Sequence, residues 1–225
     1  MKHPRKLPSA IIKRLPVRFT YDNNYFNDTY QGIPVNGYTA IFEKMLEGVD
    51  VELNADFIKN KENYEAMCDR IIYTGAIDEF FEYKHGKLEY KTTQFNHEVQ
   101  SIENSQGCAV MNYTDIETLH TRTIEHRHFT PERETQSTVI THETPTQYIA
   151  GKTEPMYPVN DDENNAIYAL YKQEAEEISD KYIMGGRLAE YKYYDMDKVI
   201  ESALKKVHEI KKQFTYELLF HQSKH

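Results

Sequence analysis

The chain has 225 residues, of which 39% are hydrophobic and 28% charged, so it is long enough to bury a core and has the composition of a soluble globular protein. Its formal net charge of −9 argues against nucleic acid as a partner, because phosphate backbones attract basic surfaces. No apolar run is long enough to cross a bilayer and no signal-peptide core opens the chain, so we expect a cytoplasmic protein with no membrane partner. Cys68 and Cys108 lie in apolar contexts without CxxC spacing, and we expect reduced thiols in the core.

Apolar spacing predicts alternating helices and short strands in the first third of the chain. Residues 1–32 carry three prolines around an apolar and basic run and have the character of the tail of a helical region. The elements expected next, in order, are a helix over 38–46 ended by Gly48, a strand over 49–53, a polar helix over 60–68 and a buried strand over 70–75. This alternation favours α/β packing.

From about residue 83 the pattern changes to period-two alternation at hairpin spacing, which predicts an antiparallel sheet. Its strands are expected at 88–92, 109–113, 121–129 and 137–141. A helix over 161–175, a strand over 181–184 and an amphipathic helix from Met196 follow, with one more helical turn within 216–225. The sequence therefore predicts a mixed α/β (α+β) fold, in which an α/β domain is interrupted by an inserted antiparallel sheet.

The positions of the glycines exclude one binding motif and indicate one candidate site. The nine glycines of the chain cannot form GxGxxG, so the dinucleotide-binding fingerprint is absent from this sequence. Gly185 and Gly186 follow a predicted strand and precede Arg187, a cluster of tyrosines and Asp195, which is placed to cap the helix from Met196. Bare backbone and a helix N-terminus suit a flat or anionic ligand, as at a cofactor or phosphate site. From the residues alone, an ordinary strand, loop and helix with exposed tyrosines fits equally well.

Two arginines and a set of histidines are the other candidates for chemistry. Arg14 and Arg122 each have uncharged neighbours in the sequence. The guanidinium fork matches phosphate oxygens, which favours an anion-binding role. Each arginine could equally pair with a carboxylate. On a strand through Arg122, His126 and His128 would share its face, and with His142 they would form an incomplete zinc set. Histidines on a half-exposed strand are more common, so we expect no metal site.

Six segments resemble, in order, those of the UDP-galactopyranose mutase family. They are RLPVRFTYDNNYF at 14–26, YQGIPVNGYT at 30–39, EKML at 43–46, RIIYTG at 70–75, YPVN at 157–160 and GGRLAEYKYYDM at 185–196. The resemblance covers most of residues 7–213. It implies an isomerase of polysaccharide biosynthesis that contracts UDP-galactopyranose to UDP-galactofuranose without net redox change. In that family the N5 of reduced FAD attacks the anomeric carbon, UDP departs, and the ring recloses on the flavin before UDP returns.

The resemblance also implies roles for individual residues. Diphosphate and sugar binding fall to Arg14 and Arg122, with Tyr25, Tyr157 and Tyr193 on the diphosphate and Asn112 in the active site. Arg14, Arg122 and Asp195 are the implied catalytic residues, since Asp195 lies near both flavin and substrate. The implied flavin contacts are Gly185, Gly186, Arg187, Asp195 and Met196, with Phe57 toward the adenine.

Two departures from the family pattern limit these expectations. Lys91 stands where the family often has arginine. A lysine keeps the positive charge but lacks the forked guanidinium that binds two oxygens at once. The family's N-terminal flavin fingerprint, its histidine under the flavin and most of its uridine-binding helix have no counterpart here. The chain therefore resembles the C-terminal portion of a mutase, and we expect it to bind FAD weakly or not at all, and to be inactive, without the missing N-terminal part.

On this interpretation the chain divides into four parts. They are the tail of a helical domain (1–32), an FAD-binding part (33–82), the antiparallel sheet domain (83–156) and the C-terminal FAD-binding part (157–225). UDP-galactose is the expected substrate, and the sequence leaves open whether the protein is a homo-oligomer. The alternatives are a non-enzymatic nucleotide-sugar or glycan-binding module that uses the same tyrosines and arginines, and a zinc-dependent hydrolase.

Overall fold

The computed structural model describes residues 19–22, 24 and 26–222, except for the side chains of 214–222. The chain forms two compact units, which meet in the sequence between Leu53 and Asn54. Arg14 and Tyr25, two of the predicted substrate residues, lie outside the described residues, so their roles stay predictions. The four domain boundaries expected from the sequence also stay a prediction.

The first unit contains one described helix, α2 (Gly37–Met45), as predicted. The helix ends at Met45, and Gly48 follows with a φ of +77°, a left-handed conformation that suits glycine. None of the residues of α2 is buried. The strand predicted over 49–53 is wrong: the segment is irregular, and Val51 and Leu53 are exposed. Alternating apolar residues form a strand only beside a hydrogen-bonding neighbour, and none of the described strands pairs with this segment.

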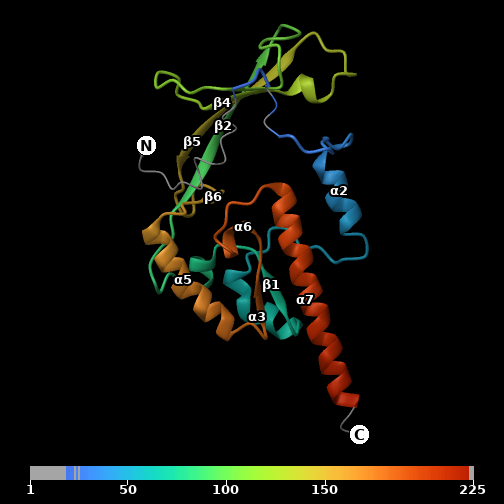
Figure 1. The fold of residues 1–225 in the computed structure, drawn as a ribbon, viewed down its shortest axis with the longest axis vertical. Helices are drawn as coiled ribbons and strands as arrows, with labels where there is room; N and C mark the ends of the chain where they lie inside the picture. The colour runs from blue at the N-terminus through green and yellow to red at the C-terminus, as the bar shows by residue number, and fades with distance from the viewer. Residues whose placement is uncertain (1–18, 23, 25, 223–225) are drawn as a thin grey trace. The chain divides into compact units, whose positions relative to one another are not determined.

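The second unit contains a small parallel sheet with its helices (Figure 1). Strand β1 (Ile71–Tyr73) pairs in parallel with β7 (Tyr182–Met184), so both predicted strands are confirmed. The helical elements are η2 (Ile58–Asn60), α3 (Lys61–Met67), α4 (Ile77–Phe80), α5 (Asp162–Glu177), α6 (Gly186–Ala189) and α7 (Met196–Gln222). The predicted helices near 60–68, 161–175 and from Met196 are confirmed. The short helix α6 stands where the sequence predicted a loop.

The predicted antiparallel sheet is present in the second unit, with the strand order β3-β4-β5-β2-β6. Its strands are β2 (Tyr90–Gln100), β3 (Val110–Asn112), β4 (Arg122–Glu125), β5 (Thr138–Gln147) and β6 (Tyr157–Pro158), and β2 and β5 form a long ribbon in Figure 1. The strand predicted over 121–129 is correct only as far as Glu125, because His126–Phe129 form the 3-10 helix η3. The neighbouring strand β3 begins at Val110, opposite Ile124, so the chain loses its hydrogen-bonding partner on that side beyond Glu125.

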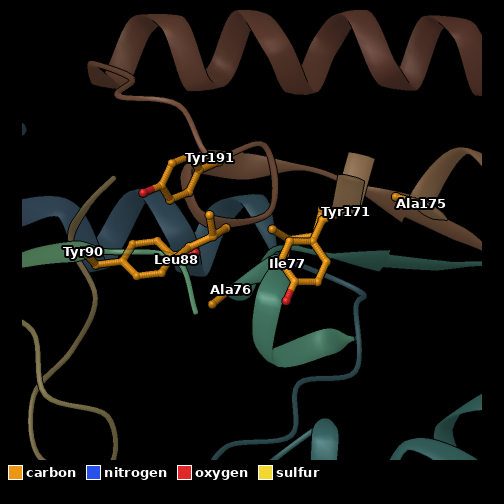
Figure 2. Close-up of a cluster of buried hydrophobic side chains, with 7 residues drawn as sticks. All are labelled: Ala76, Ile77, Leu88, Tyr90, Tyr171, Ala175 and Tyr191. Carbon is orange, nitrogen blue, oxygen red and sulfur yellow. The ribbon is translucent and has the colours of Figure 1, made fainter. Parts of the chain in front are cut away.

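Buried tyrosines dominate the core of the second unit. Figure 2 shows the main cluster, made of Ala76, Ile77, Leu88, Tyr90, Tyr171, Ala175 and Tyr191. Each buried phenol has a hydrogen-bond partner: Tyr171 donates to the Gly86 carbonyl at 2.8 Å, Tyr191 to the Glu89 carbonyl at 2.6 Å and Tyr90 to Asp78 at 3.2 Å. A buried hydroxyl without a partner would be costly, so these bonds allow tyrosine to serve as a core residue.

Two further expectations concern cysteines and membranes. The expectation that Cys68 and Cys108 lie in the core is wrong, since both are exposed free thiols. Cys68 follows the last residue of α3 and Cys108 lies in the loop before β3, so neither stands on an inward-facing position of a regular element. Within the described part of the chain, no helix combines the length and apolarity needed to cross a membrane.

Candidate functional site

Three predicted site residues meet in one group, which we call the tyrosine stack: Tyr157, Tyr193 and Arg187. The rings of Tyr157 and Tyr193 are stacked with their centroids 5.3 Å apart and their planes 17° from parallel. The Arg187 guanidinium carbon lies 5.3 Å from the Tyr157 centroid and 5.0 Å from that of Tyr193. A guanidinium over aromatic faces is favourable, and it places one positive charge beside two phenols. This is a suitable arrangement for an anionic ligand.

The stack is held from two sides by bonds to the main chain. Arg187 donates through Nη1 to the Met156 carbonyl at 3.1 Å and through Nη2 to the Tyr194 carbonyl. Tyr191 has a φ of +45°, a left-handed conformation that costs a non-glycine residue on the order of 1–3 kcal/mol. Its fully buried side chain, bonded to the Glu89 carbonyl, offsets that cost and fixes the loop that carries Tyr193.

Arg122 and Asn112 form a second group with Glu143, which we call the arginine group. Asn112 and Arg122 are directly paired across β3 and β4, and the Arg122 Nε donates to the Asn112 Oδ1 at 3.1 Å. On the other side, Arg122 Nη1 lies 3.5 Å from Glu143 Oε2, with 46% of the Arg122 side chain exposed. Glu143 was not among the predicted site residues, because only strand register places it opposite Arg122.

The strand register places both groups on one face of the sheet. Arg122 pairs with Glu143, which pairs with Phe95, while Lys91 pairs with Tyr157. Directly paired residues share a face, as do residues four apart on one strand. Arg122 and Tyr157 are separated by three strand spacings, about 14 Å, and by four residues along the strands, about 13 Å. Lys91, which departs from the family pattern, lies on the same face and donates to Gln147.

The paired glycines lie where the parallel strands end. The Gly185 N–H donates to the Tyr73 carbonyl at 2.9 Å, so the glycines directly follow the β1–β7 pair. Gly186 has a φ of +78°, and a Cβ there would lie 3.4 Å from the Cβ of Thr74. Ligands of α/β sheets bind outside the carboxyl ends of the strands, so the glycine turn stands at a suitable edge for a cofactor.

Comparison with known proteins places this geometry in one family. The family model for UDP-galactopyranose mutase matches residues 1–193. The chain is 39% identical over 207 residues to a Klebsiella pneumoniae protein named probable UDP-galactopyranose mutase, and 36% identical over 206 residues to the dTDP-fucopyranose mutase of Escherichia coli. It is also 32% identical over 219 residues to the UDP-galactopyranose mutase of Mycoplasma pneumoniae. The chain belongs to the UDP-galactopyranose mutase family.

These matches cover 89–91% of the chain but only 52–54% of the relatives. The chain thus spans about half the length of the curated relatives it matches, and the matched part is their C-terminal part. Mutases are isomerases, and this family is flavin-dependent in general.

The residues of this mutase-family chain fit one part of a flavin site. The partly buried Gly186 and the half-exposed Ile72 present backbone and apolar surface at the carboxyl edge of the parallel pair, which suits a flat ring. Gly185 itself is buried, and a Cβ there would lie 3.7 Å from the Lys206 Cδ and 3.8 Å from the Ile72 Cγ2. Met196 is 64% exposed at the first turn of α7, and the Asp195 carbonyl just before it accepts the Val199 N–H at 3.0 Å. The glycine-rich turn that would hold the pyrophosphate is absent from the sequence.

Two predicted flavin contacts take part in internal packing. The Arg187 guanidinium is directed to the rings of Tyr157 and Tyr193 and to two carbonyls, and its contact with flavin stays a prediction. The Phe57 ring packs among Tyr64, Tyr73, Phe80 and Tyr182, with centroids 5.5–6.5 Å away. Its contact with adenine remains a prediction.

The histidines behind the zinc alternative bond to separate partners. His126 Nε2 lies 2.7 Å from Thr141 Oγ1, His128 Nε2 lies 3.2 Å from Glu125 Oε2, and His142 Nε2 lies 3.6 Å from Glu98 Oε2. Burial, together with the neighbouring His97, lowers the pKa of His126. Among the residues that the structure describes, no three His, Cys, Asp or Glu side chains are grouped so that they could hold a metal ion.

Two clefts in the second unit are lined by other residues. One of about 400 Å³ lies among α5, β7 and α7, and one of about 240 Å³ lies beside Asp78, Tyr83 and Tyr148. None of the predicted site residues lines either cleft.

Proposed function

We propose that the whole protein to which this chain belongs interconverts UDP-galactopyranose and UDP-galactofuranose in the cytoplasm, with FAD as its cofactor. Family membership supports the reaction class. The observation that carries the assignment of residues is the tyrosine stack on the same sheet face as the arginine group. A positive charge with two phenols at one point, and a second arginine elsewhere on that face, suit an extended ligand with a diphosphate in its middle.

The residues of this chain bind and orient the nucleotide sugar. Tyr157 and Tyr193 hold the diphosphate through their hydroxyls, and Arg187 beneath them adds positive charge. Arg122 stabilises the charge that grows on the diphosphate as the bond to the sugar breaks, and Asn112 orients the Arg122 side chain. A reduced flavin would supply the nucleophilic nitrogen, and Gly185, Gly186 and Met196 are the residues of this chain that would help to hold it.

The parallel sheet supports a partner segment that corresponds to the N-terminal part of the relatives. Parallel strands usually lie in larger sheets covered on both faces, yet β1 and β7 are paired only with each other among the described strands. Ile72 on β1 is 58% exposed. On α7, the apolar residues Met196, Ile200, Leu204 and Val207 lie on one face by spacing and are 42–66% exposed. This apolar surface is available for a segment that corresponds to the part of the relatives that the chain does not match.

The test is a chimera in which the N-terminal part of the Klebsiella pneumoniae relative that the chain does not match precedes this chain. We expect the reduced chimera to bind flavin and to convert UDP-galactofuranose to UDP-galactopyranose, as measured by chromatography of the nucleotide sugars. The chain without that part should do neither. If a folded, flavin-loaded chimera binds UDP but converts no sugar, the chain acts as a nucleotide-sugar-binding module and the proposed activity is wrong.

One comparison favours a second substrate, because the Escherichia coli relative is named dTDP-fucopyranose mutase. The same chimera assayed with dTDP-fucopyranose decides between the two. A kcat/KM higher for dTDP-fucopyranose than for UDP-galactopyranose would change the substrate that we assign but not the class of reaction.

A further inference from the structure

We propose that Tyr191 is a positioning residue whose buried hydroxyl sets the spacing of Tyr157 and Tyr193, and thereby the affinity of the tyrosine stack for a diphosphate. The second half of this proposal rests on the function proposed above. The first half concerns only the structure of the chain.

The Tyr191 hydroxyl lies where two segments of the chain meet. It donates to the Glu89 carbonyl at 2.6 Å and accepts the Val159 N–H at 3.2 Å. The same Val159 N–H also points to the Glu89 carbonyl, at 3.0 Å. The hydroxyl therefore joins the loop after α6 to the point where the end of β6 meets the start of β2. The Asn160 side chain adds a bond, since its Nδ2 donates to the Tyr191 carbonyl at 3.0 Å.

The two residues that this hydroxyl joins, Tyr191 and Val159, are each two residues away in the sequence from one ring of the stack. Tyr157 lies two residues before Val159, and Tyr193 lies two residues after Tyr191. On the opposite side, Arg187 joins the Met156 and Tyr194 carbonyls. The two segments are thus bonded to each other on both sides of the stacked rings. The Tyr191 hydroxyl and the Arg187 guanidinium together determine how far apart the two phenols stand.

The Tyr191 side chain is suited to act as a fixed support. It is 1% exposed, and its ring stacks on Tyr168 at 5.6 Å and meets the edge of Tyr90 at 5.4 Å. Replacing it with phenylalanine keeps the ring and its packing but removes the bonds to Glu89 and Val159. The expected change is thus a looser register between the two segments rather than a loss of the core.

Tyr171 provides a matched control in the same core cluster. It is 0% exposed, donates to the Gly86 carbonyl at 2.8 Å and accepts the His85 N–H at 3.0 Å. Tyr171→Phe therefore removes a buried hydroxyl with the same kinds of bonds, but this hydroxyl joins α5 to the segment at His85 and Gly86, which carries neither ring of the stack. A merely structural role for Tyr191 predicts the same outcome for both variants.

The first measurement uses the chain itself, labelled with 3-fluorotyrosine, with the Tyr157 and Tyr193 fluorine resonances assigned by Tyr157→Phe and Tyr193→Phe. We expect Tyr191→Phe to shift or broaden both resonances and Tyr171→Phe to leave them in place. Unchanged resonances in Tyr191→Phe, or equal changes in both variants, would overturn the positioning role. If Tyr191→Phe does not fold, Asn160→Ala removes a bond to the same loop and is judged by the same resonances.

The second measurement is calorimetric titration of the chimera with UDP, together with steady-state kinetics. We expect Tyr191→Phe to weaken UDP binding about tenfold and to raise KM more than it lowers kcat, with flavin content unchanged, while Tyr171→Phe binds UDP as the parent does. Equal UDP affinities in all three proteins would overturn the link to affinity. If the parent chimera itself does not bind UDP, the proposed function fails, and the fluorine spectra still decide whether Tyr191 positions the rings.

Discussion

The two ends of the antiparallel sheet hold their polar side chains in different ways. At the near end, where Lys91 pairs with Tyr157, the tyrosine stack is bonded to main-chain carbonyls through Arg187 and supported by the buried Tyr191. What we call the far end begins four residues along the ribbon, at the Arg122–Glu143 pair, and includes the Glu125–Ile140 pair; there Arg122 is half exposed and is held by the side chains of Asn112 and Glu143. The near end is fixed by the core, whereas the far end depends on contacts between side chains.

The difference matters for a ligand that is taken apart and reassembled. Bonds to buried main-chain groups are costly to break, so the near end offers a fixed grip. The contact between Arg122 and Glu143 is long, at 3.5 Å, and 46% of the Arg122 side chain is exposed, although only 17% of Glu143 is. Ion pairs exposed to solvent contribute about 0–1 kcal/mol, so Arg122 is more easily transferred to a ligand anion than the bonded Arg187 is. Under the proposed function, the tyrosine stack keeps UDP bound while Arg122 stabilises the negative charge that grows on the diphosphate when the bond to the sugar breaks.

The largest effect is expected at the far end. In the chimera, Arg122→Ala should lower kcat by about 100- to 1000-fold, because it removes charge stabilisation that is needed as UDP departs. Arg122→Lys should recover part of the rate, since it restores the charge without the fork. Arg133→Ala, on the exposed loop after η3, is the control and should leave the rate unchanged. Equal rates for Arg122→Ala and Arg133→Ala would remove Arg122 from the catalytic group.

A smaller effect is expected at the near end. Tyr193→Ala should weaken binding of UDP to the chimera about tenfold, on the order of 1–2 kcal/mol, because it removes the proposed hydroxyl contact with the diphosphate and the ring that packs on Tyr157 and Arg187. Tyr193→Phe keeps the stack and should lose less. Lys192→Ala, at the exposed neighbouring residue, is the control in the titration. An affinity reduced as much by Lys192→Ala as by Tyr193→Ala would show that general charge, not the stack, holds the nucleotide.

Local sequence signals were sufficient for most elements of the fold. Helix α2 before Gly48, helix α5 after Asp161, and strand β7 before the paired glycines were predicted from spacing and capping residues. The failures over 49–53 and 126–129 share a cause. In both segments the residues alternate as a strand does, but hydrogen bonding to a neighbour is incomplete: none of the described strands pairs with 49–53, and beyond Glu125 the chain has no partner on the β3 side, although β5 continues to Thr138. A single sequence does not contain that information.

The candidate site was predictable only in part. The segment from Gly185 to Met196 was recognisable from its residues, but the role of each side chain came from resemblance to the family. Glu143 was missed because its place beside Arg122 depends on register between strands 21 residues apart in the sequence. The direction of Arg187, toward the tyrosines, depends on the short helix α6, which the sequence did not predict.

The smallest effect contrasts a buried carboxylate at each end of the sheet. Burial raises the pKa of Glu125, but hydrogen bonds from the main-chain N–H groups of Gln106 and Ser105, both 2.8 Å long, outweigh it and lower the pKa from 4.5 to about 2. Burial also raises the pKa of Asp78, and there it outweighs the bonds from Leu88 and Tyr90. The two carboxylates therefore have opposite pH dependence.

Glu125 contributes stability above its unfolded pKa, near 4.5, and loses that stability as the pH falls toward 2. Asp78 behaves in the opposite way, because the folded state takes up its proton at a higher pH than the unfolded chain, so acidification adds stability at the near end. Between pH 6 and pH 4, the amide protection factors of Ser105 and Gln106 should fall about fourfold, while that of Leu88 should hold or rise. Hydrogen exchange followed by NMR measures both.

Glu125→Gln should abolish the pH dependence of the loop amides and leave Leu88 unaffected, since the two carboxylates stand at opposite ends of the sheet. A parallel loss of protection at both ends would mean that the sheet opens as one unit, and the distinction between a fixed near end and a separately held far end would not hold.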